Sequence, residues 1–246
     1  PQNPTGTTFT KEALEAICDM VLEENKRREA GEKKLYVLYD QMYWQLTYGD
    51  IRHYDPVSLR PQMKAYTVYI DAISKCFAAT GVRVGWAMGP EAIMSKMKAI
   101  LSHVGAWAPM AEQKAVARFL LQYDDINNYL QHFKAEISLR LQKIYNGFMR
   151  LKAEGLPVDA IAPQAAIYLT VRVTARGMKT TSEQLLEQQK DVTGYLLNEA
   201  GIALVPFYAF GASKDSSWYR LSVGACKKEE IDAMIEALAQ ALRKLK

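Results

Sequence analysis

The chain has 246 residues, of which 49% are hydrophobic and 24% are charged, and its 31 basic and 27 acidic side chains leave a net charge of +4. This composition is typical of a globular protein with a buried core, and such evenly spread charges argue against a nucleic-acid or membrane partner. The three cysteines lack C-x-x-C spacing, no apolar run is long enough to span a membrane, and no signal peptide is recognisable. We therefore expect a cytoplasmic protein without a disulfide framework.

The first half of the chain alternates helices with short strands. Thr10 is a suitable N-cap for a helix that should end near residues 30–31. Apolar and β-branched runs predict strands at 35–39, 65–70 and 82–88, and a helix should follow at 91–103. This alternation is typical of a parallel sheet covered by helices. Ligands of such sheets bind outside the carboxyl ends of the strands, which is where Asp40 and Lys75 lie.

The second half changes in character. A helix at 109–121 should precede a long helix whose apolar side chains keep a spacing of three or four residues from 130 to 151. Strands are expected near 166–173, 203–206 and 218–223. The last helix should bury a stripe formed by Ile231, Ile235, Leu238 and Leu242. These elements predict a smaller α+β unit.

Lys75 is the most informative residue of the sequence. It stands beside Ser74 in a loop after a predicted strand, and Arg83 follows eight residues later, across a turn that contains glycine. Such a lysine can hold an aldehyde cofactor covalently, and the arginine fork suits the cofactor's phosphate. Pyridoxal phosphate also needs a carboxylate that keeps its ring nitrogen protonated, and Asp40 at a strand end is the candidate.

Three further side chains complete this hypothesis. Tyr43 and Asn3 can contact the phenolic oxygen of the cofactor, and Arg220 offers a bidentate fork to a substrate carboxylate. Each residue alone has an ordinary explanation as a surface charge or a turn residue. All of these residues together, in this order along the chain, favour a site for pyridoxal phosphate. The histidines show no metal-ligand spacing, so the sequence predicts no metal site.

Four motifs in order carry a resemblance to a known family: Asn3-Pro4-Thr5-Gly6, Asp40-Gln41-Met42-Tyr43, Ser74-Lys75 with Arg83, and Tyr219-Arg220-Leu221-Ser222. The sequence resembles the class I/II aminotransferases, which are fold-type I pyridoxal-phosphate enzymes. The resemblance implies that Lys75 is the Schiff-base lysine and proton shuttle, and that Asp40 pairs with the pyridine nitrogen. It also implies that Arg83 binds the phosphate and that Arg220 binds the substrate α-carboxylate.

The same resemblance carries expectations about architecture and partners. Residues 1–140 would form the C-terminal part of a large, mainly parallel, three-layer α/β domain that binds the cofactor, and residues 141–246 a small α+β domain. The protein would exchange an amino group between an amino acid and a 2-oxo acid, and would act as a homodimer. Relatives carry a long segment before the Asn-Pro-Thr-Gly motif, so we expect an N-terminal portion of the same protein to complete the site.

Two departures from the family pattern bear on the chemistry. Many members have a phosphate-binding serine three residues before the lysine, where this chain has Ala72, and Gln41 stands where an acidic residue often follows the aspartate. Two alternatives stay open. One is a fold-type I lyase, such as a carbon-sulfur β-lyase, and the other is the ligand-sensing, aminotransferase-like domain of a transcription regulator.

Overall fold

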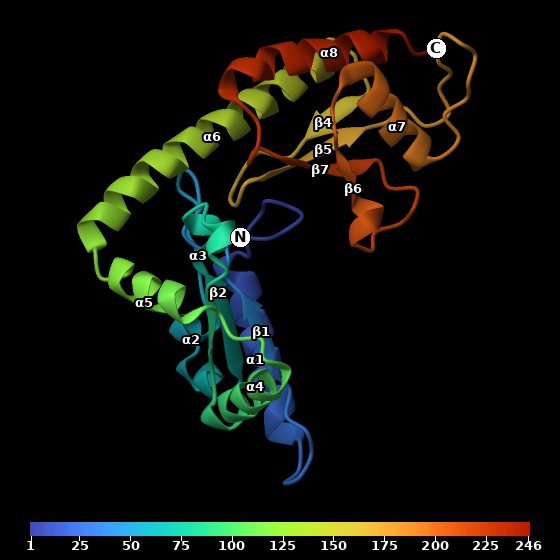
Figure 1. Ribbon diagram of the computed structural model, residues 1–246. Coiled ribbons are helices and arrows are strands. Elements are labelled where there is room, and N and C mark those ends of the chain that lie inside the picture. The colour runs from blue at the N-terminus through green and yellow to red at the C-terminus, as the bar shows by residue number, and fades with distance from the viewer. The chain divides into compact units, whose positions relative to one another are not determined.

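The computed structural model describes residues 1–246, which divide into two compact units. The first unit consists of Pro1 and Thr8–His132, and the second of Gln2–Thr7 and Phe133–Lys246. Each is described here by itself, with the element labels of Figure 1. None of the helices combines the length and the apolar composition that crossing a lipid bilayer requires.

The first unit contains three strands and several helices. Its elements are, in chain order, α1 (Lys11–Arg27), β1 (Val37–Asp40), α2 (Pro56–Leu59), the 3-10 turn η1 (Pro61–Ala65), β2 (Thr67–Ala72), α3 (Ile73–Cys76), the 3-10 turn η2 (Thr80–Val82), β3 (Gly85–Met88), α4 (Glu91–Val104) and α5 (Met110–Phe119). The long helix α6 (Tyr123–Ala153) begins in this unit and ends in the second.

The sheet of the first unit has the strand order β1-β2-β3. β1 and β2 are parallel, as expected, with Asp40 opposite Ile70. β3 runs antiparallel to β2, so the prediction of a parallel sheet is wrong for this strand. The reason is the short connection, which holds only α3 and η2 and includes Arg83 in the left-handed conformation with φ +61°. A parallel return usually contains a helix that packs across the sheet, and α3 has only four residues.

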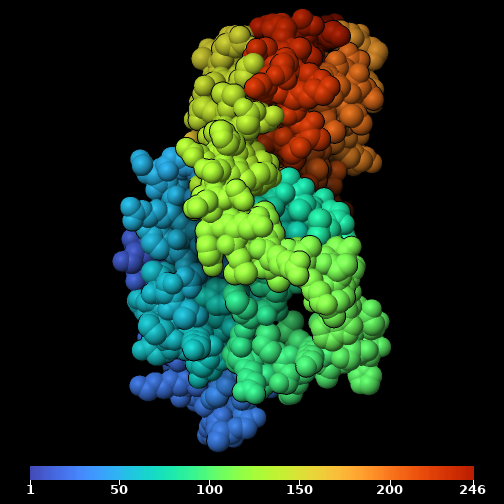
Figure 2. Space-filling model, turned by 60° about the vertical axis from the view of Figure 1, so that its left-hand side comes forward, coloured from blue at the N-terminus to red at the C-terminus, as the bar shows by residue number.

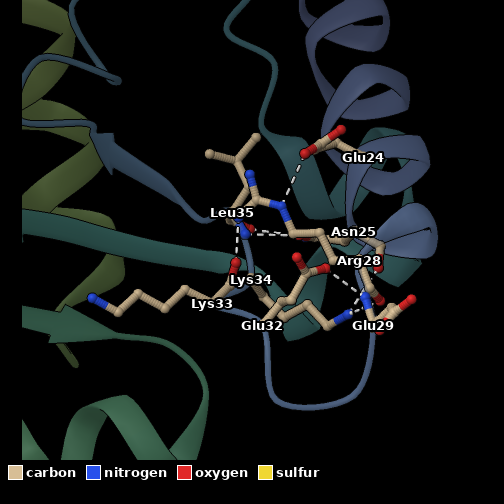
Figure 3. A network of polar contacts seen from close by, with 8 residues as sticks. All are labelled: Glu24, Asn25, Arg28, Glu29, Glu32, Lys33, Lys34 and Leu35. Carbon is tan, nitrogen blue, oxygen red and sulfur yellow. Dashed lines mark hydrogen bonds and ion pairs between the residues drawn. The ribbon is translucent and has the colours of Figure 1, made fainter.

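α1 begins as predicted and ends earlier than predicted. The Thr10 hydroxyl accepts a hydrogen bond from Ala13 N at 3.2 Å. The helix ends at Arg27 because side chains beyond it satisfy its last carbonyls (Figure 3). Lys34 Nζ donates to the carbonyls of Asn25 and Arg28 at 3.0 and 2.8 Å, and the Asn25 side chain exchanges two hydrogen bonds with the backbone of Leu35. These contacts lead the chain directly into β1.

Two small apolar clusters form the core of the first unit. The buried face of α1 packs with Met63 of η1, and Val37 and Tyr39 of β1 lie against them. The second cluster joins Ile73 of α3, Val84 and Val116 of α5. The first cluster therefore holds α1 and η1 against β1, and the second holds α3, which follows β2, against α5.

The second unit is an antiparallel sheet packed against helices. Its elements after α6 are β4 (Val158–Ala160), β5 (Tyr168–Val173), α7 (Gln189–Ala200), β6 (Val205–Pro206), the 3-10 turn η3 (Phe207–Phe210), β7 (Trp218–Ser222), the 3-10 turn η4 (Lys228–Glu230) and α8 (Ile231–Arg243). The strand order is β4-β5-β7-β6, and every neighbouring pair is antiparallel.

α8 buries the stripe predicted from its spacing. All four predicted side chains are at most 2% exposed: Ile231, Ile235, Leu238 and Leu242. The red surface of α8 lies beside the yellow C-terminal part of α6 in Figure 2, where Lys143 of α6 pairs with Asp232 at 2.7 Å. Gly147 provides room for the close approach, because a Cβ there would lie 2.6 Å from Ile235 Cγ1.

The Asn-Pro-Thr-Gly segment belongs to the second unit. The Gly6 carbonyl accepts a hydrogen bond from Ala165 N at 2.9 Å, and the Thr5 carbonyl accepts one from the Thr170 hydroxyl at 2.7 Å. Gly6 has φ +69°, and a Cβ on it would lie 2.3 Å from the carbonyl oxygen of Tyr168. Only glycine fits this turn against β5.

Candidate functional site

Asp40 and Lys75 lie beyond the carboxyl ends of neighbouring parallel strands. Asp40 is the last residue of β1, and Lys75 is in the single-turn helix α3 that follows β2 directly. Because β1 and β2 are parallel, both side chains belong to the same edge of the sheet. The Asp40 carboxylate is exposed and accepts one hydrogen bond, from Met42 N at 3.2 Å.

The cationic candidates of the first unit form no ion pairs. Lys75 is partly buried, and its amine has neither a hydrogen-bond nor an ion-pair partner. Arg83 is exposed and donates from Nη1 to the carbonyl of Thr80 at 2.8 Å. The remaining guanidinium donors face no carboxylate. Both groups are thus available to an external ligand.

Tyr43 lies in the turn that follows Asp40. Its side chain is buried, with 6% of its surface exposed. Two backbone hydrogen bonds shape the turn, from Trp44 N to the Gln41 carbonyl at 2.9 Å and from Leu46 N to the Tyr43 carbonyl at 2.8 Å. The Cys76 thiol donates to the Met42 carbonyl at 3.2 Å and so ties this turn to α3.

Arg220 and Asn3 come together in the second unit. Arg220 lies on β7, and its Nη1 donates to Asn3 Oδ1 at 2.8 Å. The guanidinium stacks over the rings of Tyr168 and Phe210, whose centroids lie 4.6 and 4.9 Å from Cζ. Its Nε is buried without a hydrogen-bond partner. Such a group is organised to receive an anion.

The six predicted side chains therefore divide between the units. The first unit carries Asp40, Tyr43, Lys75 and Arg83, and the second carries Asn3 and Arg220. Tyr168 and Phe210 were not predicted as partners of the arginine. Their signal in the sequence is weak, because a tyrosine in a strand and an aromatic turn are both common in protein cores.

Asp71, near the end of β2, is the other feature that the motifs do not reveal. Its carboxylate is buried, with 6% of the residue exposed, and accepts hydrogen bonds from Ala72 N at 2.7 Å and from Trp44 Nε1 at 3.0 Å. Burial raises the pKa of this carboxyl group, and the hydrogen bonds oppose the rise. The sequence marks Asp71 only as a charged residue that closes a strand.

The donor set fits pyridoxal phosphate. The cofactor has an aldehyde, a protonated ring nitrogen, a phenolic oxygen and a phosphate, which call for an amine, a carboxylate, neutral donors and a cation. Four charged candidates form no ion pair within the protein: Asp40, Lys75, Arg83 and Arg220. Ala72, 5% exposed, supplies a methyl group where a hydroxyl could have bound the phosphate.

Comparison with known proteins gives consistent matches. The model of the family "Aminotransferase class I and II" matches residues 1–238. An aspartate aminotransferase of Geobacillus stearothermophilus is 31% identical over 217 residues, which are 86% of this chain and 49% of that protein. An aspartate aminotransferase of Rhizobium meliloti is 27% identical over all of this chain and 55% of its own length.

Solved structures agree with the sequence matches. The crystal structure of the aspartate aminotransferase from Rhizobium meliloti has a TM-score of 0.82 at 25% identity and covers all of this chain and 57% of its own. The aromatic aminotransferase from Pyrococcus horikoshii has a TM-score of 0.83 at 26% identity, over 99% of this chain and 58% of its own. The chain thus spans about half the length of the relatives that it matches.

Proposed function

Because this chain belongs to the aminotransferase class I and II family, we propose that the whole protein is a pyridoxal-phosphate-dependent aminotransferase that moves an amino group from an amino acid to a 2-oxo acid. The observation that carries the proposal is the partly buried amine of Lys75, which has no partner and lies at the sheet edge that also bears Asp40. A structural lysine in such a position would be expected to pair with a carboxylate.

Each side chain of the first unit has a role toward the cofactor. When bound, pyridoxal phosphate supplies an aldehyde that reacts with amines and an electron-poor ring that accepts negative charge from the substrate α-carbon. Lys75 would hold the cofactor covalently and, once released, carry the proton at the α-carbon. Asp40 would accept a hydrogen bond from the ring N–H, and the Tyr43 hydroxyl would donate to the phenolic oxygen. Arg83 would bind the phosphate in a bidentate manner.

The second unit would bind the substrate. Arg220 packs on two aromatic rings, and its guanidinium would receive the α-carboxylate. The Asn3 side-chain oxygen already accepts a hydrogen bond from Arg220, which leaves the amide nitrogen for the phenolic oxygen. Aspartate and aromatic amino acids are the first substrates to test, since the names of the matched proteins include both. A homodimer and a cytoplasmic location are part of the same proposal.

The test is an absorption spectrum of the full-length protein with pyridoxal phosphate. Wild-type protein should show the visible band of the bound cofactor, and amino acids should change that band without release of ammonia. Lys75→Ala should lose the band and lower transamination at least roughly a thousandfold, because a positioned general base contributes on the order of 10²–10⁴. Lys98→Ala, which changes an exposed lysine of α4, is the matched control.

Two results would contradict the proposal. A visible band that survives in Lys75→Ala would show that another amine holds the cofactor. Ammonia and pyruvate formed without an added 2-oxo acid would identify a lyase instead.

A further inference from the structure

The buried carboxylate of Asp71 has no role in the site as described so far. It accepts hydrogen bonds from Ala72 N and Trp44 Nε1, and no cation pairs with it. A buried carboxylate without a cation is costly to keep, and an apolar residue of similar size would avoid that cost. Its presence needs an explanation beyond core packing.

The two donors come from the two segments that carry the cofactor side chains. Trp44 belongs to the turn that follows Asp40 and contains Tyr43. Ala72 is the last residue of β2 and directly precedes α3, the helix of Lys75. One oxygen of Asp71 accepts from Ala72 N at 2.7 Å and the other accepts from Trp44 Nε1 at 3.0 Å. The carboxylate therefore joins the two segments at the carboxyl ends of β1 and β2.

We propose that Asp71 is a positioning residue of the cofactor site, which fixes the turn bearing Tyr43 relative to the helix bearing Lys75. This inference rests on the proposed function. Asp71 acts through its hydrogen-bond donors and does not itself bind the cofactor. Its negative charge also lies within electrostatic reach of Asp40, so the two carboxylates act on the same edge of the sheet.

A carboxylate is needed here because both of its oxygens accept hydrogen bonds. An asparagine at this position would present one oxygen and one NH2 group. Whichever way the amide turned, either Ala72 N or Trp44 Nε1 would face another donor and lose its partner. Asp71→Asn should therefore remove the hydrogen bond to one of the two segments, either the turn of Trp44 or the start of the segment that leads into α3. The volume of the side chain stays the same.

The experiment compares three single variants and one double variant, Asp71→Asn with Trp44→Phe, of the full-length protein. Asp71→Asn removes one oxygen, Trp44→Phe removes one donor, and Asp55→Asn is the matched control. Asp55 is a part-buried carboxylate of the same unit. It accepts hydrogen bonds from Val57 N and Ser58 N of α2 and from the Tyr69 hydroxyl of β2, and none of these donors belongs to the turn of Tyr43 or to α3. Each variant is measured for its dissociation constant for pyridoxal phosphate and for visible circular dichroism per bound cofactor.

Asp71→Asn should weaken cofactor binding about tenfold and reduce the visible circular dichroism, since an unmet hydrogen bond to a charged group is worth at least one factor of ten. Trp44→Phe should weaken binding roughly threefold. The double variant should match Asp71→Asn alone, because Trp44 acts through the same carboxylate. Asp55→Asn keeps the single oxygen that accepts all three hydrogen bonds of Asp55, so it should leave both cofactor readouts at the wild-type values.

The possible failures can be told apart. If Asp71→Asn changes the cofactor readouts no more than Asp55→Asn, the positioning role is wrong while the proposed function stands. If Asp71→Asn does not fold, Trp44→Phe decides, and unchanged readouts in that variant overturn the role. If the wild-type full-length protein binds no pyridoxal phosphate, the proposed function itself fails.

Discussion

His53 lies close to two aromatic rings and has no hydrogen bond at one of its nitrogens. The imidazole lies 5.9 Å from the Tyr39 ring and 6.1 Å from the Trp44 ring, measured between centroids. Its Nε2 is buried without a partner. Burial lowers the pKa of His53 from 6.5 to about 4, and the charge of Asp55 opposes this shift only weakly. The folded protein therefore keeps this histidine neutral.

This lowered pKa predicts how stability depends on pH. Between about pH 6.5 and pH 4 the unfolded chain binds a proton at His53 that the folded protein excludes. The free energy of unfolding should thus fall as the pH falls through this window. His53→Gln, which cannot titrate, should lose this part of the decline, as measured by denaturant unfolding at pH 7, 5.5 and 4. Identical slopes for the two proteins would contradict the prediction.

At the scale of single residues, the sequence predicts side chains that act by their own chemistry. Asp40 and Lys75 follow predicted strands, and their positions at one sheet edge follow from the parallel pairing of those strands. Asp71 could not be predicted in the same way. Its significance depends on burial and on a hydrogen bond to Trp44, 27 positions away, and neither is encoded in local spacing.

At the scale of elements, Gly6 tests the turn that packs against β5. Gly6→Ala should destabilise the protein by at least about 2 kcal/mol, because positive φ and a clash with the Tyr168 carbonyl add together. Gly201→Ala is the matched control, since Gly201 has φ +66° and open space where a Cβ would be. It should cost about 1 kcal/mol from backbone strain alone. If denaturant unfolding gives the same loss of unfolding free energy for Gly6→Ala and Gly201→Ala, the contact with the Tyr168 carbonyl does not add to the cost.

The sequence predicts some helices and strands well and misses others, and the difference has physical reasons. α8 was predicted because its apolar residues repeat at helical spacing and are all buried. α7 was not, since Gly194 interrupts it and polar Gln189 is one of its buried residues, so its apolar stripe is weak. The direction of β3 depends on the short turn before it, and strand patterns do not specify direction.

At the scale of the whole molecule, the charged side chains proposed to bind the cofactor belong to the first unit, and the arginine proposed to bind the substrate belongs to the second. Arg220→Lys should therefore keep the visible absorption of the bound cofactor and lower kcat/KM for amino acids about a hundredfold, because lysine cannot form a bidentate fork. Arg172→Lys is the matched control. Arg172 lies on the neighbouring strand β5 and also stacks on an aromatic ring, Trp218, at 5.1 Å.

The control variant should retain wild-type kcat/KM. Loss of the cofactor band in Arg220→Lys would mean that this arginine serves the cofactor, contrary to its proposed role.

The sequence does not predict that Asn3 belongs to the second unit, because its position near the start of the chain places it beside the first unit. Its hydrogen bond spans 217 positions, and only tertiary packing could reveal it.

Two aromatic rings close to Arg220 restrict how any anion can reach the guanidinium. Its Cζ lies over the rings of Tyr168 and Phe210, at 4.6 and 4.9 Å from their centroids, so an anion that uses both donors of the fork must approach away from these rings. A carboxylate is planar and can align both oxygens with the plane of the fork, whereas a phosphonate or a sulfonate is tetrahedral and brings a third oxygen toward a ring. The proposed enzyme should therefore reject aminophosphonic and aminosulfonic analogues of its substrates on the basis of shape, although their charge is suitable.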